Sequence, residues 1–126
     1  MRVIEIEPTT LRSSKEHAYY LNELLQHALS DGASHICTLD PDSFPITDDW
    51  LENILRATPP ASGFAGVLRT ENGDVALPHP SCTLALRQFY IDVTTSFAPD
   101  SDYTKEFRAF LRTTRQAADT GIRIGY

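Results

Sequence analysis

Two aspartates one residue apart, Asp40 and Asp42, are the residues of this chain best suited to chemistry. They follow a short apolar run over residues 36–39, which predicts a buried strand with both carboxylates at its carboxyl end. In open α/β sheets, ligands bind at that end of the strands. Two carboxylates there are a partial site for Mg²⁺ or Mn²⁺, which usually completes its coordination with substrate phosphates.

The spacing of the two aspartates is weak evidence without their position. Composition alone predicts an Asp-x-Asp pattern roughly 0.8 times in this chain, and it occurs twice, at Asp40/Asp42 and at Asp100/Asp102. The first pair gains weight because it directly follows an apolar strand, and Pro41 stiffens the turn between its members. The alternative is a turn rich in Asp and Pro that only caps the next helix.

Two further side chains are candidates for the same site. His79 lies in the rigid segment 77–80 and is a candidate third metal ligand or phosphate contact; the alternative is an exposed loop histidine. Arg87 is a candidate phosphate contact, although a single arginine carries no specific signal.

The bulk composition indicates one domain over residues 1–126. A net charge of −6 and a pI near 5.0 argue against nucleic acid as a partner. No apolar run approaches the roughly 20 residues of a membrane span, and the start of the chain does not resemble a signal peptide. We therefore expect a cytoplasmic protein whose Cys37 and Cys82 are reduced, buried thiols.

The elements expected to position the candidate residues alternate between strands and helices. Periodicity, caps and breakers predict a strand over 2–7, a helix from a Ser13/Glu16 capping box to Gly32, a strand over 35–39, a helix from Thr47 to Pro59, a strand over 63–70, a hairpin at Asn72-Gly73 returning over 75–77, a strand over 81–86, and helices over 87–94 and 103–118. The strand–helix alternation of the first half predicts a parallel sheet with right-handed crossovers. The expected fold is therefore α/β, a three-layer arrangement in which helices flank a mostly parallel sheet on both faces.

Three segments together carry a family resemblance. They are His17-Ala-Tyr-Tyr-Leu-Asn22, the turn Asp40-Pro-Asp42 and Asp49-Trp-Leu51. In this arrangement the chain resembles the nucleotide-sugar glycosyltransferases with a Rossmann-like GT-A fold. The resemblance implies that Asp40 and Asp42 hold a divalent Mn²⁺ or Mg²⁺ that bridges the diphosphate of the sugar donor. It also implies that Asn22, Asp40 and Arg87 belong to the substrate-binding site.

The resemblance extends along the rest of the chain. Residues 63–86 look like the strands that follow in the family, and Asp102 with the ending Gly121-Ile-Arg-Ile-Gly-Tyr126 is similar to its acidic motif and Gly-x-Arg-Ile element. This implies Asp102, with Asp100 as the alternative, as the base that deprotonates the acceptor hydroxyl. The family's first two strands and helix, which bind the base and ribose of the donor, have no counterpart, so the resemblance is to part of a GT-A domain.

Three functions are compatible with these observations. The first is metal-dependent transfer of a sugar from a nucleoside diphosphate sugar to a hydroxyl acceptor. The second is a catalytically silent α/β interaction module that pairs through an exposed sheet edge with a second copy or another chain. The third is a phosphohydrolase-like domain with Asp40 as nucleophile, for which the further Lys, Ser and Asp motifs are not evident.

Overall fold

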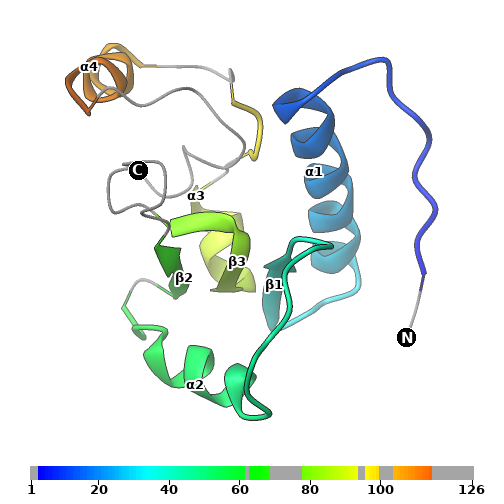
Figure 1. Ribbon diagram of the computed structural model, residues 1–126, viewed down its shortest axis with the longest axis vertical. Helices are drawn as coiled ribbons and strands as arrows, with labels where there is room; N and C mark the ends of the chain where they lie inside the picture. Colours follow the sequence, from blue (N-terminus) through cyan, green and yellow to red (C-terminus); the bar gives the residue numbers. More distant parts are fainter. Residues whose placement is uncertain (1–2, 62, 69–77, 94–95, 100–103, 115–126) are drawn as a thin grey trace.

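The computed structural model describes residues 3–61, 63–68, 78–93, 96–99 and 104–114. In chain order its elements are α1 (Ser14–Ser30), β1 (His35–Leu39), α2 (Trp50–Ala57), β2 (Phe64–Leu68), β3 (Pro78–Leu86), α3 (Arg87–Val93) and α4 (Lys105–Thr114) (Figure 1).

The sheet differs from the predicted one in size and direction. Within the described residues it has three strands in the order β1-β3-β2, and β3 pairs antiparallel with both neighbours. The prediction of a three-layer, mostly parallel sheet with flanking helices is therefore wrong. Because β1 and β2 both run against β3, they run parallel to each other, as a strand–helix–strand unit requires, but β3 lies between them. Hydrophobic periodicity shows that a segment is a strand and leaves the direction of its partner open.

The strand predicted over residues 2–7 is also wrong: the described residues 3–9 form no strand. Figure 1 draws this segment on the far side of α1 from the sheet. A strand needs a neighbour that accepts and donates its backbone hydrogen bonds, and no described strand lies beside this segment. The alternation of apolar and polar residues there is consequently misleading.

The first helix follows its sequence signals most closely at its carboxyl end. It starts at Ser14, but Ser13 has φ 55° and makes no side-chain capping bond, so the predicted capping box does not form. At the other end Gly32 has φ +73°, in the left-handed region, and its N–H donates to Leu29 O over 3.2 Å. That is the glycine-terminated helix end that the sequence predicts.

One face of the sheet carries the core. Ile36 of β1 lies opposite Ala85 of β3, and both pack with Ala18 and Leu25 of α1 and with Tyr90 of α3. The next pair on this face is polar: the hydroxyls of Thr38 and Thr83 lie 2.6 Å apart, and that of Thr38 donates to Pro80 O over 2.8 Å. Strand side chains alternate between the two faces, so Leu39 and Cys82, also directly opposite one another, lie on the other face.

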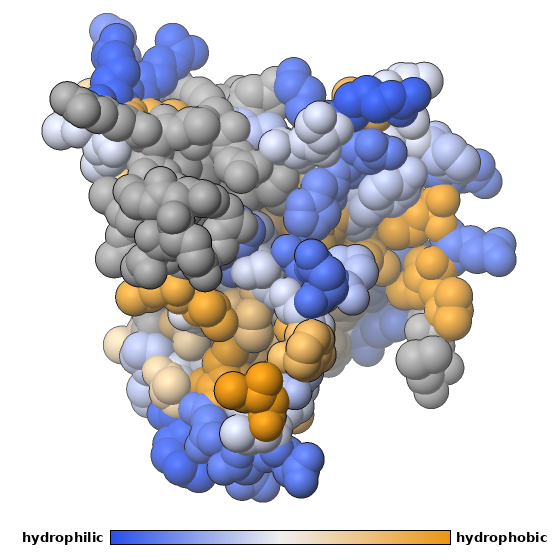
Figure 2. Space-filling model, in the orientation of Figure 1, coloured by the Kyte–Doolittle hydropathy of each residue, from blue (hydrophilic) through white to orange (hydrophobic). Residues whose placement is uncertain are grey.

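That second face is only partly covered, by α2. Figure 1 places α2 beneath the end of β2, and none of its residues is fully buried. In Figure 2 apolar side chains gather just above the polar ones at the bottom of the view. Phe44 is 78% exposed and Ile46 is 91% exposed in the loop before α2. Part of the apolar surface on this side is therefore open to solvent, although Leu84 of β3, on the same face, is buried.

Candidate functional site

The two aspartates that the sequence singles out stand on a tight turn at the carboxyl end of β1. The Asp40 N–H donates to Ser81 O over 3.0 Å, which extends the ladder with β3 by one residue beyond the strand. The Ser43 N–H then donates to Asp40 O over 2.9 Å and closes a β-turn with Pro41 at its second position. Proline is favoured there because its φ is already fixed near the required value. The strand-then-turn prediction for this segment is confirmed, but the strand is buried on one face only, so the prediction of a buried strand is wrong for its other face.

A histidine that the sequence did not single out lies next to Asp40. The Nε2 atom of His17, in the first turns of α1, is 3.6 Å from Oδ1 of Asp40. The side chains are 42% and 22% exposed, so solvent reaches both. His17 and Asp40 both belong to segments that carry the family resemblance. That shared membership was the signal in the sequence that could have indicated their proximity.

His79 reaches the same end of the sheet by way of β3. It pairs with Val67 of β2, and its Nδ1 accepts a hydrogen bond from the Ser81 N–H over 3.2 Å. Ser81 is also the residue that receives the Asp40 N–H. His17, Asp40, Asp42 and His79 are thus brought to one end of the sheet. Whether His79 binds metal or phosphate stays a prediction.

Both polar atoms of the Asn22 side chain make hydrogen bonds within the protein. Its Oδ1 accepts from the Phe97 N–H over 2.9 Å, and its Nδ2 donates to Ser96 Oγ over 2.9 Å. Both ends of the side chain therefore hold the segment after α3 against α1. The substrate-binding role implied for Asn22 would require these bonds to be given up.

Arg87 lies at the opposite end of β1 from the aspartates. The strand register puts Leu86 beside His35, whereas Cys82 lies beside Leu39 at the Asp40 end. The guanidinium donates through Nε and Nη2 to Leu29 O, over 3.3 and 3.2 Å. Since four residues of strand span about 13 Å, the structure does not bring Arg87 to the aspartates. It instead caps the last turn of α1.

Several sequence predictions fall on residues outside the described part. Asp100 and Asp102, the candidate bases, lie there, as do the hairpin Asn72-Gly73 and the ending 121–126. The strands before and after residues 69–77, β2 and β3, pair antiparallel.

The donor set at the end of β1 suits a weak, partial divalent-metal site. Carboxylate oxygens and imidazole nitrogens are ligands for Mn²⁺, and Mg²⁺ or Mn²⁺ often binds through one or two carboxylates plus substrate phosphates. Among the described residues no three His, Cys, Asp or Glu side chains converge on one point. A cation held by Asp40 and Asp42 would therefore depend on ligands from its substrate.

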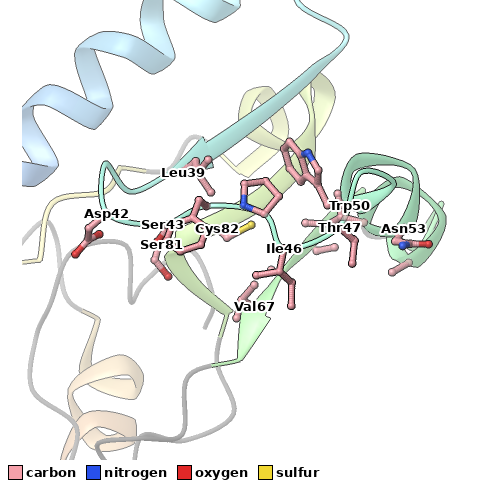
Figure 3. A pocket seen from close by; sticks show the side chains of 16 residues that line it. Leu39, Asp42, Ser43, Ile46, Thr47, Trp50, Asn53, Val67, Ser81 and Cys82 are labelled. Carbon is pink, nitrogen blue, oxygen red and sulfur yellow. The ribbon is translucent and has the colours of Figure 1, made fainter.

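A groove of about 730 Å³ opens beside this turn (Figure 3). It lies between α2, the second face of the sheet and the loop that joins β1 to α2. Its lining residues are Leu39, Asp42, Ser43, Phe44, Pro45, Ile46, Thr47, Trp50, Asn53, Ile54, Ala57, Ala65, Gly66, Val67, Ser81 and Cys82. Figure 3 shows Asp42 at one end of this set and Asn53 at the other. Asp42 therefore belongs to both the acidic turn and the groove.

On the α2 side, the groove adjoins the polar residues at the start of the helix. Asp49 is the residue before α2, where a carboxylate favours the helix dipole. Hydrogen bonds with the Thr47 and Asn53 side chains lower the pKa of Asp49. Thr47 and Asn53 both line the groove, so the Asp49 carboxylate lies beside two of its polar groups. The sequence indicates Thr47 as the cap and Asp49 as a dipole partner; the helix begins two residues later than that.

The groove residues themselves are not predicted by the sequence. The pattern of α2 favours Trp50 as a core residue, yet it is half-buried and lines the groove. The available signal was the loop segment Phe44-Pro-Ile46, which puts two large apolar side chains in a stretch otherwise rich in Asp, Ser and Thr.

Comparison with known proteins gives no relative. No family model matches the sequence, and no curated protein or solved structure matches the chain. In the part of the chain that the structure describes, no helix has the length and apolar character needed to cross a membrane.

Proposed function

We propose that this chain binds a nucleoside diphosphate sugar and a divalent cation at the carboxyl end of β1, as a glycosyltransferase-like domain. The observation that carries the proposal is the position of Asp42. It stands in the turn after β1 together with Asp40, and it also lines the 730 Å³ groove. A pair of potential metal ligands thus adjoins a cavity large enough for a small organic ligand.

The chemistry of the turn is consistent with this role. Asp40 and Asp42 would hold the cation, which supplies Lewis-acid stabilisation of the diphosphate leaving group when bound. His17, with its Nε2 atom 3.6 Å from Oδ1 of Asp40, would be the side chain nearest to that ligand. In the transfer itself, the bond from the anomeric carbon to the diphosphate oxygen breaks. The acceptor oxygen then bonds to that carbon, and the acceptor proton passes to a base, for which Asp102 and Asp100 remain the candidates.

Isothermal titration of UDP and GDP, each with and without Mn²⁺, tests the proposal directly. We expect binding that requires the metal and that is lost when Asp40 and Asp42 are both replaced by Asn. Asp48→Asn is the matched control, because Asp48 is an exposed carboxylate outside both the turn and the groove. Equal binding by the double variant, or no binding of either nucleotide with Mn²⁺, would contradict the proposal.

A second candidate function is an interaction module, and the sheet edges favour it. Both β1 and β2 are edge strands of the described sheet. Val67 and Leu68 at the end of β2 are 48% and 54% exposed. Exposed apolar edge strands are templates for pairing with another chain. Light scattering over a wide concentration range distinguishes the cases, since a strict monomer at high concentration counts against self-pairing.

A further inference from the structure

The groove beside the acidic turn has a lining that is unsuited to the charged part of a nucleotide. Most of it is apolar, and its polar side chains, apart from Asp42, are the uncharged groups of Ser43, Thr47, Asn53 and Ser81. Among the described lining residues there is no Lys, Arg or His. Among the described lining residues, a phosphate or carboxylate entering this groove would meet no counter-ion and would meet one carboxylate.

We propose that the groove binds an uncharged apolar molecule that carries a hydroxyl group, with the apolar body between α2 and the sheet. Burial of a charge without a partner costs far more than burial of a hydroxyl that finds a hydrogen-bonding group. Asp42 is exposed at one end of the groove, so solvent screens its charge from a ligand group bound deeper between α2 and the sheet, while the carboxylate stays available to a cation at the turn. Ser43, Thr47, Asn53 and Ser81 offer donors and acceptors of the kind that a hydroxyl uses.

The side chains around the groove indicate where the apolar body lies. Phe44 and Ile46 are among the most exposed large apolar residues described, at 78% and 91%, and both line the groove. In the view of Figure 3, Ile46 is drawn between Trp50 and Val67 of β2, and all three side chains line the groove. A ligand lying between these side chains would remove their surface from water, which stabilises the complex by roughly 25 cal/mol per Å² of apolar area.

The binding of such a molecule does not depend on the proposed function. We further assign the bound molecule as the sugar acceptor, and that assignment rests on the proposed function. If the diphosphate of a donor lies at Asp40 and Asp42, a hydroxyl near the Asp42 end of the groove is adjacent to it. The two ideas fail separately: nucleotide binding is measured with Mn²⁺ and UDP or GDP, and groove binding is measured with neither present.

The chain contains a single tryptophan, Trp50, which lines the groove and therefore reports its occupancy by fluorescence. Titration with 1-octanol, octylammonium and octanoate compares one apolar body with three head groups. We expect 1-octanol to saturate the signal and to bind at least about tenfold more tightly than octanoate, and no less tightly than octylammonium. Tighter binding of octanoate or octylammonium, or an unchanged signal with 1-octanol, overturns the proposal.

Two residues of α2 give a matched pair of variants. Ile54 lines the groove, whereas Leu51 is exposed and lies outside it. We expect Ile54→Gln to weaken 1-octanol binding at least about fivefold, and Leu51→Gln to leave it unchanged. Equal effects of the two substitutions would mean that the ligand does not occupy this groove.

The two cysteines supply a second readout on the unaltered chain. Cys82 lines the groove and Cys37 does not. We expect 1-octanol to slow alkylation of Cys82 and to leave the rate at Cys37 unchanged, as measured by mass spectrometry of the labelled peptides. Protection of both thiols, or of neither, contradicts binding in the groove and does not depend on the folding of any variant.

Discussion

The side-chain oxygen of Asn22 accepts a hydrogen bond from the backbone N–H of Phe97, 75 residues later in the chain. Its amide nitrogen donates at the same time to Ser96 Oγ. Phe97 is 2% exposed and belongs to the core cluster with Ala18 and Leu25 of α1. The Asn22 amide thus fixes a buried aromatic residue and its backbone against the first helix.

Loss of the Asn22 amide should destabilise the fold. Asn22→Ala leaves the Phe97 N–H without its partner, and we expect a loss of about 1–3 kcal/mol in the free energy of unfolding. Asn22→Asp keeps an oxygen acceptor for that N–H, so it should cost less. Denaturant unfolding followed by circular dichroism measures both, and an Ala variant as stable as the Asp variant would contradict this role.

The Tyr90 hydroxyl is a buried polar group whose removal should be harmless. Tyr90 is 4% exposed, and its hydroxyl makes no hydrogen bond to the described residues. Tyr90→Phe should therefore leave the stability unchanged or raise it by up to about 1 kcal/mol, because an unpaired buried hydroxyl disfavours folding.

Thr38→Val is the control for Tyr90→Phe. It removes a buried hydroxyl that is fully paired, with Thr83 Oγ1, the Thr83 N–H and Pro80 O. We expect it to cost about 1–3 kcal/mol. If Tyr90→Phe and Thr38→Val lowered the stability measured by thermal unfolding by similar amounts, the Tyr90 hydroxyl would have a hydrogen-bond partner.

Stability should fall in alkaline solution. The prediction of two buried thiols is wrong, because Cys37 is exposed and Cys82 is only partly buried. The partial burial of the thiol groups still raises the pKa values of both above the ordinary 9.0, and the Cys82 charge adds to the rise at Cys37. Burial also raises the pKa of Tyr90 above the ordinary 10.0. The nearby Thr83 hydroxyl, which is not in hydrogen-bonding geometry with the Tyr90 hydroxyl, offsets part of the rise, and the Cys37 charge adds to it. These groups ionise at lower pH in the unfolded chain, so the unfolded state loses protons first.

The contribution of the two thiols and the Tyr90 hydroxyl to the free energy of unfolding is fully present below about pH 9. It is lost as the pH rises through their pKa values in the folded protein. We expect the melting temperature to decline steadily above pH 9 in the presence of a reductant. Serine at both cysteine positions together with Tyr90→Phe should flatten that decline. A decline of the same steepness in the triple variant would assign it to other groups.

Two glycines with positive φ should respond differently to alanine. Gly32 has φ +73°, and no atom lies within 4 Å of the place that an alanine methyl would take, so Gly32→Ala should cost about 1–2 kcal/mol from backbone strain alone. At Gly63, φ is +60° and the added carbon would lie 2.9 Å from Leu86 Cδ1 and 3.2 Å from Leu86 Cβ. Gly63→Ala should therefore cost distinctly more, and equal melting temperatures for the two variants would contradict the close packing on Leu86.

The sequence by itself determined most of the helices and strands and the acidic turn. Leu21, Leu25 and Leu29 recur at helical spacing, and Gly32 ends the helix where the sequence predicts. The apolar run at 35–39 forms β1, and Pro41 sets the turn that follows. These features depend on neighbouring residues, because caps, breakers and periodicity act over a few positions along the chain.

Only the tertiary structure decided how the strands pair and where the apolar side chains meet. The residues of 35–39 do not encode whether the neighbouring strand is parallel or antiparallel. In the structure β3 is the central strand, and the segment 3–9 lies outside the sheet. Asn22 and Arg87, candidates for substrate binding by resemblance, became structural anchors through partners far along the chain. The groove likewise needs α2, β2 and the loop after β1 together, since none of them closes it alone.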